Sequence, residues 1–412
     1  MLTPSRVDSP ETVLEPKLPR RDWLVLPMLS LFSICLLIAC AELIARSLLD
    51  FSRFSGRDFP DCVAFKGPSA GFHGVPNSVC WEKSDEFPLV EYRFNSCGHY
   101  SRMECGPKPA GTYKIVIVGS SAVMGLGVQQ EQTLPALLPK DLEQRTGRKV
   151  EVYNEALPGA GGTPHSVTLH FSEALSGEPD SILWILVPAD ISRISEILPA
   201  PEPPRLPGIF GQTRFRIQEA LTRMPLRDAI PHILDILREL FSNSHPGIML
   251  RHYLYESQSL YLSAYLRTGE AGFLKADPGA EWRERLLELD KYDAYMEERA
   301  REAGVPMVVS FLPNHAQAAM VSMGNWPPGY DPYRLDNELR AMVTRHGGIY
   351  VDALPEFRSF ANPEQYFYPV DGHPNAAGHA VFAQVLAKEL TSGSVPELKT
   401  GTPSQPMLDQ SR

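Results

Sequence analysis

Two segments far apart in the chain carry the residue types of an activated serine nucleophile. Ser121 follows the apolar run Tyr113–Val118, and Asp371 and His373 lie near the other end of the sequence. A serine hydroxyl attacks a carbonyl only when a base takes its proton, and histidine, whose pKa is near neutrality, is the usual base. A carboxylate then holds the imidazole in the productive tautomer. We therefore expect Ser121 to be a nucleophile, His373 its base and Asp371 the orienting acid.

Each segment alone also allows a plainer interpretation. A strand, turn and helix around residues 113–128 could bind a phosphate, but the glycine spacing fits neither the dinucleotide-binding nor the P-loop pattern. Asp371 to Asn375 could be an ordinary turn, because Asn375 is well placed to cap a following helix whose apolar face includes Val381, Phe382, Val385 and Leu386. The two segments gain weight only when they are taken together.

Taken together, they resemble the SGNH, or GDSL-type, hydrolase superfamily. Gly119-Ser120-Ser121 is similar to its first sequence block and Asp371-Gly372-His373-Pro374-Asn375 to its last, and the resemblance runs from about Phe94 to Leu390. It implies a three-layer α/β/α fold, flavodoxin-like, with about five parallel strands. It also implies esterase, lipase, deacetylase or acyltransferase chemistry without a cofactor, carried by the same three residues.

The middle blocks match less well. By the resemblance, Gly159 in Asn154–Gly159 supplies a backbone amide to the oxyanion hole beside the amide of Ser121; a plain turn is the alternative. The third block places Ala189 where the family has an asparagine, and the loss of such a donor costs a rate factor of about 10² to 10³. A slower enzyme, a substitute donor such as Asn314, or a fold that no longer catalyses could result. The two-residue step from Asp371 to His373 resembles membrane-associated acetyltransferases.

The elements that must position these residues alternate regularly along the sequence. Short apolar, β-branched runs alternate with longer amphipathic stretches, which indicates a parallel sheet with helices on both faces. The predicted strands are Tyr113–Val118, Val150–Tyr153, Ser181–Val187, Val305–Leu312 and Ile349–Val351. Ser121 would then lie at the carboxyl edge of the sheet, where ligands bind in open α/β folds.

This alternation of strands and helices is interrupted between about residues 200 and 300. Pro199–Pro207 is rich in proline and should be extended, and apolar residues then recur at helical spacing. They are Ile230, Ile233, Leu234, Leu237, Leu240 and Phe241. The sequence predicts a helical insertion between the third and fourth strands, which is either structural padding or a cap that selects the substrate.

An uncharged apolar run, Trp23–Ala41, precedes the folded part. At ~1.5 Å rise per residue it nearly spans a ~30 Å hydrocarbon core, and it predicts a transmembrane helix. Lys17, Arg20 and Arg21 favour a cytoplasmic amino terminus, residues 1–22, and an extracytoplasmic, periplasmic body. A cleaved signal peptide, or a lipoprotein with Cys40 as its lipidated terminus, are the alternatives.

Four cysteines follow the apolar run: Cys62, Cys80, Cys97 and Cys105. In an exported protein they can form two disulfides, and we expect neighbours to pair, although four cysteines allow three pairings and free thiols are the alternative. The rest of the chain is expected to divide into a juxtamembrane region 42–110, a catalytic domain 111–392 and a disordered tail 393–412.

Composition limits the partners. The formal net charge is −10 and no basic stripe occurs, which excludes a phosphate-backbone partner. His165 and His170 have helical or loop spacing without neighbouring carboxylate or cysteine ligands, and His379 falls on the predicted final helix, so we expect no metal site.

The sequence as a whole predicts a membrane-anchored, extracytoplasmic serine esterase, acyl hydrolase or O-acyltransferase. Its expected substrate is an acylated glycan, cell-wall or lipid molecule, and its expected membrane contact is the amino-terminal helix. The alternatives are a catalytically silent binding or assembly protein with the same fold, and a nucleotide-binding α/β protein.

Overall fold

The computed structural model describes residues 22–49, 57–67, 71–194 and 226–399. The chain forms two compact units, Met1–Leu48 and Leu49–Arg412. The predicted extended segment Pro199–Pro207 and most of the predicted amino-terminal and carboxyl-terminal tails lie outside the described residues.

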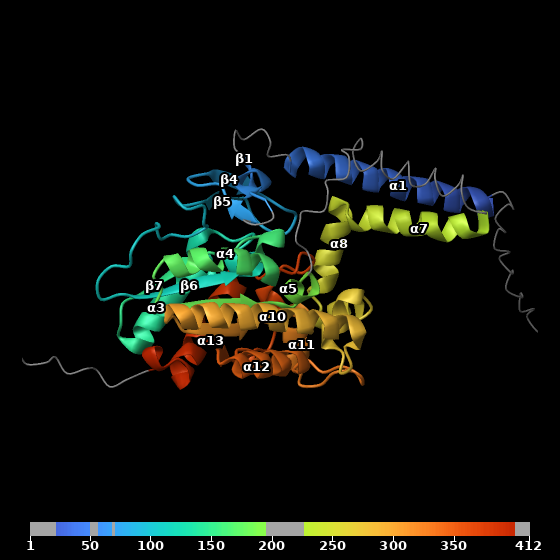
Figure 1. Cartoon of the computed structure of the whole chain (residues 1–412). Helices are drawn as coiled ribbons and strands as arrows, with labels where there is room; N and C mark the ends of the chain where they lie inside the picture. The colour runs from blue at the N-terminus through green and yellow to red at the C-terminus, as the bar shows by residue number, and fades with distance from the viewer. Residues whose placement is uncertain (1–21, 50–56, 68–70, 195–225, 400–412) are drawn as a thin grey trace, which may run out of the picture. The chain divides into compact units, whose positions relative to one another are not determined.

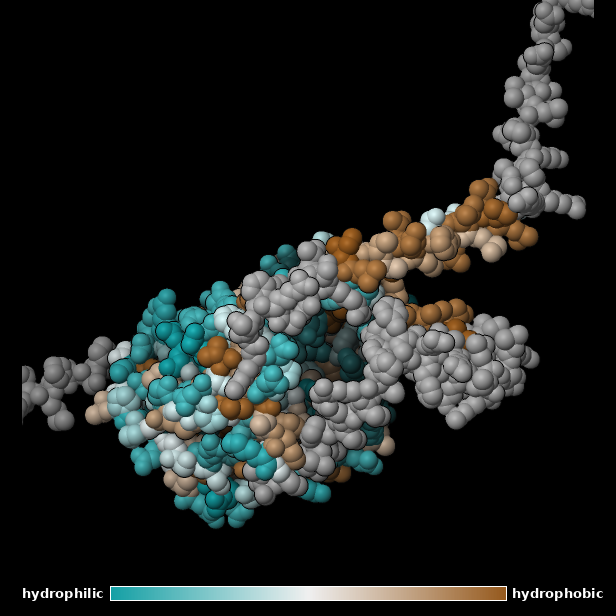
Figure 2. Space-filling model, turned by 90° about the horizontal axis from the view of Figure 1, so that it is seen from above, coloured by the Kyte–Doolittle hydropathy of each residue, from teal (hydrophilic) through white to brown (hydrophobic). Residues whose placement is uncertain are grey.

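The first unit contains helix α1 (Asp22–Leu49). Its segment Trp23–Ala45 is long and apolar enough to cross a membrane. Apolar side chains cover the helix surface, such as Trp23 at 71% exposure and Phe32 at 65% (Figure 2). The predicted span, Trp23–Ala41, lies within this segment. Length and composition make α1 a candidate membrane span or signal sequence.

A five-stranded parallel sheet forms the centre of the second unit (Figure 1). Its strands, in chain order, are β6 (Tyr113–Gly119), β7 (Val150–Asn154), β8 (Ser181–Leu186), β9 (Met307–Phe311) and β10 (Ile349–Val351). They lie in the order β10-β9-β8-β6-β7, and all four pairings are parallel. The predicted fold class is confirmed, because each predicted strand forms and differs from the observed one by two residues or fewer at either end.

The strands are apolar throughout because both faces of the sheet are covered. Ile115 and Ile117 of β6 pack into one core cluster, and Val116 and Val118 pack into another on the opposite face. Successive side chains of a strand point to opposite faces, so a strand buried on both sides reads as a continuous apolar run.

Helices form the outer layers (Figure 1). One face carries α2 (Ser121–Met124), α3 (Leu134–Thr146) and α13 (Ala376–Glu389). The other carries α4 (Pro164–Ser176), α10 (Gly279–Ala303) and α12 (Arg334–His346). Two further helices, α5 (Pro188–Ser192) and α11 (His315–Met323), follow β8 and β9 directly. The three-layer arrangement places the starts of α2, α5 and α11 at one edge of the sheet.

The region before the sheet is folded rather than a simple juxtamembrane linker. Strands β1 (Arg57–Asp58), β4 (Val79–Glu82) and β5 (Val90–Arg93) form one small sheet, and β2 (Val63–Phe65) pairs with β3 (Phe72–Gly74). Disulfides join Cys62 to Cys80 and Cys97 to Cys105, as predicted. Cross-links of this kind stabilise a segment whose strands are too short to be stable alone.

The stretch between β8 and β9 contains the predicted helical insertion. Its described elements before α10 are α7 (Leu226–Ser242), α8 (His245–Tyr255), α9 (Gln258–Tyr265) and the 3-10 turn η5 (Gly269–Leu274). Ser244 caps α8, since its hydroxyl accepts a hydrogen bond from the amide of Gly247. Leu234 and Leu237 of α7 are exposed.

The folded domain extends beyond the predicted boundary at residue 392. The short turn η9 (Pro396–Leu398) follows η8 (Leu390–Ser394), and Val395 and Leu398 are buried in the core. The prediction of a disordered tail from residue 393 is therefore wrong for residues 393–399, because these two apolar side chains gain more from burial than their backbone loses in entropy.

Candidate active site

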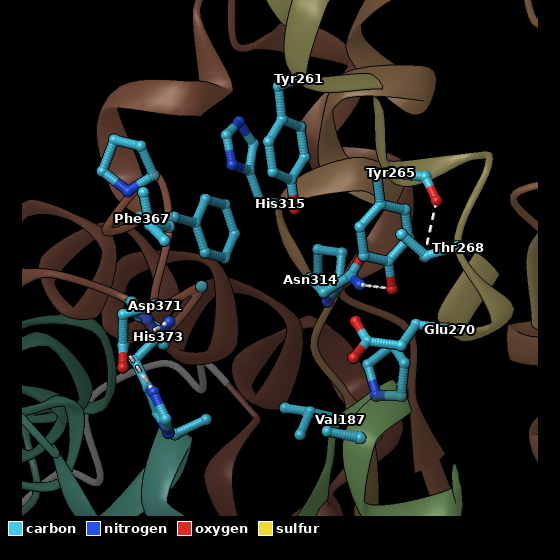
Figure 3. Close-up of a pocket in the computed structure, with 18 of the residues that line it drawn as sticks. Val187, Tyr261, Tyr265, Thr268, Glu270, Asn314, His315, Phe367, Asp371 and His373 are labelled. Carbon is cyan, nitrogen blue, oxygen red and sulfur yellow. Dashed lines mark hydrogen bonds and ion pairs between the residues drawn. The ribbon is translucent and has the colours of Figure 1, made fainter. Parts of the chain in front are cut away.

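The three predicted catalytic residues meet at the carboxyl edge of the sheet. Ser121 Oγ lies 2.8 Å from His373 Nε2, and His373 Nδ1 lies 2.7 Å from Asp371 Oδ1 (Figure 3). With Nδ1 protonated, His373 donates to the carboxylate and its free Nε2 can accept the serine proton. The arrangement is a complete hydrogen-bonded chain from hydroxyl to acid.

The turn that carries Ser121 is held by close backbone packing. A side chain at Gly119, the last residue of β6, would place its Cβ 2.7 Å from the carbonyl oxygen of Ile185. A side chain at Gly162 would come within 2.3 Å of Ser120 Cα. Only glycine fits at such approaches. Because α2 begins at Ser121, the first amides of this helix have no acceptor within it and can serve a developing negative charge.

Asp190 ties the nucleophile turn to the neighbouring strand, a role that sequence reasoning missed. Its side chain is fully buried beside Ser120 and accepts a hydrogen bond from the amide of Val187 at 2.9 Å. Burial raises the pKa of Asp190 to about 7, although the neighbouring Ser120 hydroxyl and Val187 amide oppose the shift. Asp190 therefore fixes the turn from β8 into α5, beside Ser120.

The loop that carries the acid and base is closed on itself. The amide of Tyr368 donates to the carbonyl of His373, and Asn375 caps α13 by accepting from the Gly378 amide at 3.0 Å, as predicted. Burial raises the pKa of Asp371, but the hydrogen bonds from the His373 ring and backbone outweigh it and hold the pKa below its usual value. Asp371 is thus ionised at neutral pH and can stabilise an imidazolium.

Glu86, in the connection between β4 and β5, holds this loop from outside. Its side chain, 3% exposed, accepts from the amides of Val370 at 3.0 Å and Asp371 at 2.6 Å. The same carboxylate lies 2.8 Å from His252 Nδ1 on α8. Sequence reasoning missed Glu86, because its partners lie far away in the chain and only the fold brings them together.

Gly159, the second predicted oxyanion donor, begins the short helix η4 (Gly159–Gly162) after β7. Its backbone is left-handed with φ of 58°, and the space where a Cβ would stand is open. It is exposed and does not line the pocket that holds Ser121. Its amide stays a predicted donor.

The third-block position behaves as the sequence indicated. Ala189 lines the pocket beside Ser121 and offers no donor. Asn314, the suggested substitute, caps α11 through its carbonyl oxygen, which accepts from the Gln317 amide, and its Nδ2 donates to the Tyr265 hydroxyl at 2.9 Å. Both ends of the Asn314 amide are therefore engaged in holding structure.

A pocket with a volume of ≈ 640 Å³ opens over the triad (Figure 3). The sheet edge and the triad loop form one side, and the insertion forms the other. From the insertion come Arg251, Tyr255, Tyr261, Tyr265, Thr268 and Glu270. Charged, hydroxyl and aromatic groups thus face the nucleophile, and the size is that of a small-molecule site.

An aromatic stack joins the two sides of the pocket. The ring of His315 lies between Tyr261 of α9, at 3.7 Å and 11°, and Phe367 of the triad loop, at 5.4 Å and 6° (Figure 3). Burial lowers the pKa of His315 to about 3, and neither ring nitrogen has a partner among the described residues. His315 is therefore a neutral stacking residue.

No family model and no curated protein matches the chain. Among solved structures, TesA matches with 15% identity and a TM-score of 0.35, over 68% of this chain and 98% of TesA. A catalytic mutant of Axe2, an acetylxylan esterase from Geobacillus stearothermophilus, matches with 12% identity and a TM-score of 0.36, over 68% of this chain and 94% of that chain. A protein described as a GDSL-like lipase, from Parabacteroides merdae, matches with 12% identity and a TM-score of 0.36, over 72% of this chain and 100% of that chain. Identities and TM-scores this low carry no argument about activity, which rests on this chain's own side chains.

Proposed function

We propose that this protein is a serine esterase or O-acyltransferase that acts on an acylated glycan or lipid at a membrane surface. The observation that carries the proposal is the continuous hydrogen-bonded chain Ser121–His373–Asp371, with distances of 2.8 and 2.7 Å. These three residues come from two distant segments, and a structural role would not require this order of hydroxyl, imidazole and carboxylate.

The reaction proceeds in two halves. Ser121 Oγ attacks the ester carbonyl carbon while its proton moves to His373 Nε2, and the oxyanion is stabilised by the Ser121 amide at the start of α2. The intermediate collapses when His373 returns the proton to the leaving alkoxide, which leaves an acyl group on Ser121. Water or an acceptor hydroxyl, deprotonated by His373, then removes the acyl group.

The pocket lining favours a sugar over a long acyl chain. Arg193, Arg251 and Glu270 are charged, and Thr268 and Tyr265 carry hydroxyl groups. A hydrocarbon tail would displace water from the charged groups without replacing its hydrogen bonds, which costs binding energy, whereas sugar hydroxyls can replace them. A small acyl group such as acetyl then lies at Ser121.

The proposed location is the outer side of a membrane. The apolar helix α1 supplies the anchor, and Lys17, Arg20 and Arg21 before it favour a cytoplasmic amino terminus. The two disulfides after the helix fit an oxidising compartment.

Labelling of the full-length protein in detergent with a fluorophosphonate probe tests the proposal. Wild type is expected to be labelled, and Ser121→Ala and His373→Ala to lose the label, because the probe reports an activated serine. Ser359→Ala, which changes an exposed serine outside the pocket, is the matched control and keeps the label. A folded wild type that is not labelled would contradict the proposal.

Hydrolysis and transfer differ only in the molecule that attacks the acyl-serine. Incubation with an acetyl donor and candidate sugars, followed by mass spectrometry, separates them: an acetylated sugar indicates transfer, and acetate alone indicates hydrolysis.

Ala189 favours one second candidate, a silent binding or assembly protein that kept the fold. This reading predicts that Ser121→Ala changes neither probe labelling nor the cellular phenotype. Labelling that depends on both Ser121 and His373 would exclude it.

A further inference from the structure

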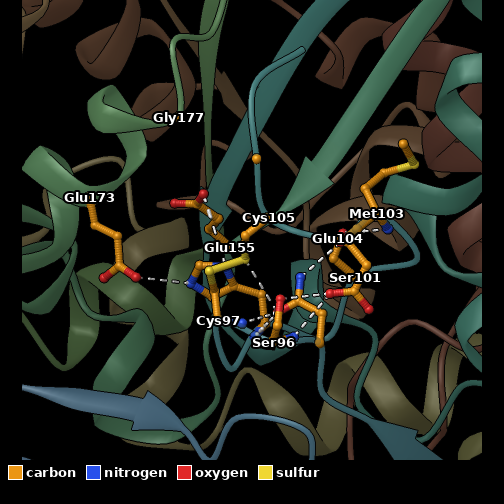
Figure 4. Close-up of a disulfide and its surroundings, with 12 residues drawn as sticks. Ser96, Cys97, Ser101, Met103, Glu104, Cys105, Glu155, Glu173 and Gly177 are labelled. Carbon is orange, nitrogen blue, oxygen red and sulfur yellow. Dashed lines mark hydrogen bonds and ion pairs between the residues drawn. A yellow bond between two sulfur atoms is a disulfide. The ribbon is translucent and has the colours of Figure 1, made fainter. Parts of the chain in front are cut away.

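A second cluster of titratable side chains lies outside the catalytic pocket. His73 on β3 and His99 after β5 meet Glu155, which follows β7, and His170 and Glu173 of α4. Figure 4 shows Glu155 and Glu173 near the disulfide Cys97–Cys105. We propose that this cluster is a zinc site whose ligands are His73, His170 and Glu173.

The ligand atoms are already close to a common centre. His73 Nε2 lies 3.2 Å from Glu173 Oε2, and the candidate atoms of His73, His170 and Glu173 all lie within 4.8 Å of one another. Ligands at about 2.0–2.1 Å from a tetrahedral zinc are roughly 3.3 Å apart. One pair therefore has the required separation, and the His170 atom lies within 4.8 Å of both of its members.

The two imidazoles have nitrogens that the protein leaves unpaired. His170 Nε2 and His73 Nδ1 are buried and have no hydrogen-bond partner among the described residues. Buried polar atoms are normally satisfied, so each such atom needs an explanation. Coordination would satisfy the His170 nitrogen.

The remaining members of the cluster form an outer layer. His99 Nε2 lies 3.8 Å from Glu173 Oε1, and His99 Nδ1 lies 4.0 Å from Glu155 Oε1. A cavity of ≈ 10 Å³ is lined by His73, His99, His170 and Glu155, which is about the space of one small ion or water. His99 can therefore orient Glu173 or supply a fourth ligand, the arrangement that tunes metal sites.

The ligand types select the metal. Two imidazoles and one carboxylate suit zinc, whereas calcium and magnesium prefer sites made of oxygen atoms alone. Lys66 opposes a cation here because its ammonium lies near His99 and His170, but Lys66 is exposed and its charge is screened by solvent.

The sequence expectation of no metal site rested on a wrong premise. Glu173 follows His170 by three residues on α4, and residues at this spacing share one face of a helix. His73 lies on strand β3, far from α4 in the sequence. Because Gly119 and Leu157 line the same cavity, the metal would join the disulfide-bonded region to the layer below the nucleophile turn, a structural role.

The test measures zinc binding by the full-length protein in detergent. The protein is stripped with EDTA, exposed to ZnCl₂, gel-filtered and analysed by inductively coupled plasma mass spectrometry and thermal unfolding. Wild type is expected to retain one zinc per chain and to melt at a higher temperature than the stripped protein. Glu173→Gln and His170→Gln are expected to bind at least roughly 100-fold more weakly, the upper end of what loss of an outer-layer partner costs.

His165→Gln is the matched control, because it changes another histidine of α4 and should keep the zinc. Zinc that is absent from wild type, unaffected by Glu173→Gln and His170→Gln, or lost equally in His165→Gln would overturn the site. Should the ligand variants fail to fold, the wild type loaded with Co²⁺ decides: intense visible absorption indicates four-coordinate nitrogen and oxygen ligation, and its absence contradicts the proposal.

Discussion

The substitution Glu86→Gln tests whether the triad depends on a residue outside it. The carboxylate of Glu86 accepts hydrogen bonds from the amides of Val370 and Asp371. The same carboxylate lies beside His252 Nδ1. Glutamine has the same shape but replaces one acceptor oxygen with a donor. In either amide orientation the negative charge that the Val370 and Asp371 amides face is lost, and with the nitrogen at the Oε2 position the Asp371 amide meets an N–H group instead of an oxygen.

The expected magnitude follows from the lost contact. A hydrogen bond to a charged group contributes about 1.5–3 kcal/mol, and each ~1.4 kcal/mol of transition-state stabilisation is a factor of ten in rate. Glu86→Gln should therefore lower kcat/KM by about 10- to 100-fold. The upper limit is the ~10⁴-fold loss expected when the orienting carboxylate of a triad is itself disabled.

The assay is the second-order rate constant of fluorophosphonate labelling, together with hydrolysis of p-nitrophenyl acetate. Asp85→Asn is the control, because Asp85 pairs with His245 of the same helix α8 but makes no hydrogen bond or ion pair with the triad loop among the described residues. A folded Glu86→Gln protein with an unchanged rate would refute the reasoning. An equal loss in Asp85→Asn would show that docking of α8, rather than support of Asp371, is responsible.

Three further predictions concern stability and are measured by thermal unfolding. His315→Phe should keep the stack with Phe367 and cost less than about 1.5 kcal/mol, whereas His315→Ala should cost about 3 kcal/mol; similar losses in both would argue against stacking. Burial raises the pKa of Glu297 to about 8, above its value of about 4.5 in the unfolded chain, so wild type loses stability as the pH rises between these values. Glu297→Gln should therefore raise the melting temperature at pH 9 and change it little at pH 4. Parallel pH profiles of wild type and Glu297→Gln would contradict this. Replacing Cys62 and Cys80 by serine opens a loop with a sequence separation of 18 and should cost about 3 kcal/mol; an unchanged melting temperature would show that this disulfide does not constrain the unfolded chain.

The sequence predicted the sheet well because its signal is local. Each strand is a continuous apolar run, since both faces are buried, and β6 and β8 were located nearly to the residue. The catalytic positions were also predictable, because the types of Ser121, Asp371 and His373 carry the chemistry wherever the fold places them.

The rest of the site depends on contacts between distant segments. Strands β1 to β5 have two to four residues each, too few for a periodicity to show. Glu86 and Asp190 act through backbone amides, which have no signature in sequence. His73 lies on β3 and Glu173 on α4, and only the fold brings these two residues together.

The insertion between β8 and β9 lines the pocket, whereas the sheet strands and the triad residues come from other parts of the chain. Strands β8 and β9 are neighbours in the sheet, and α10, which packs on one face of the sheet, leads into β9. Helices α8 and α9 line the pocket, yet they contribute no strand and no triad residue. This stretch can therefore diverge without changing the strand order of the sheet, provided that its contacts to Glu86 and His315 are kept. New substrate preferences can thus arise through changes in one connection of an otherwise unchanged scaffold.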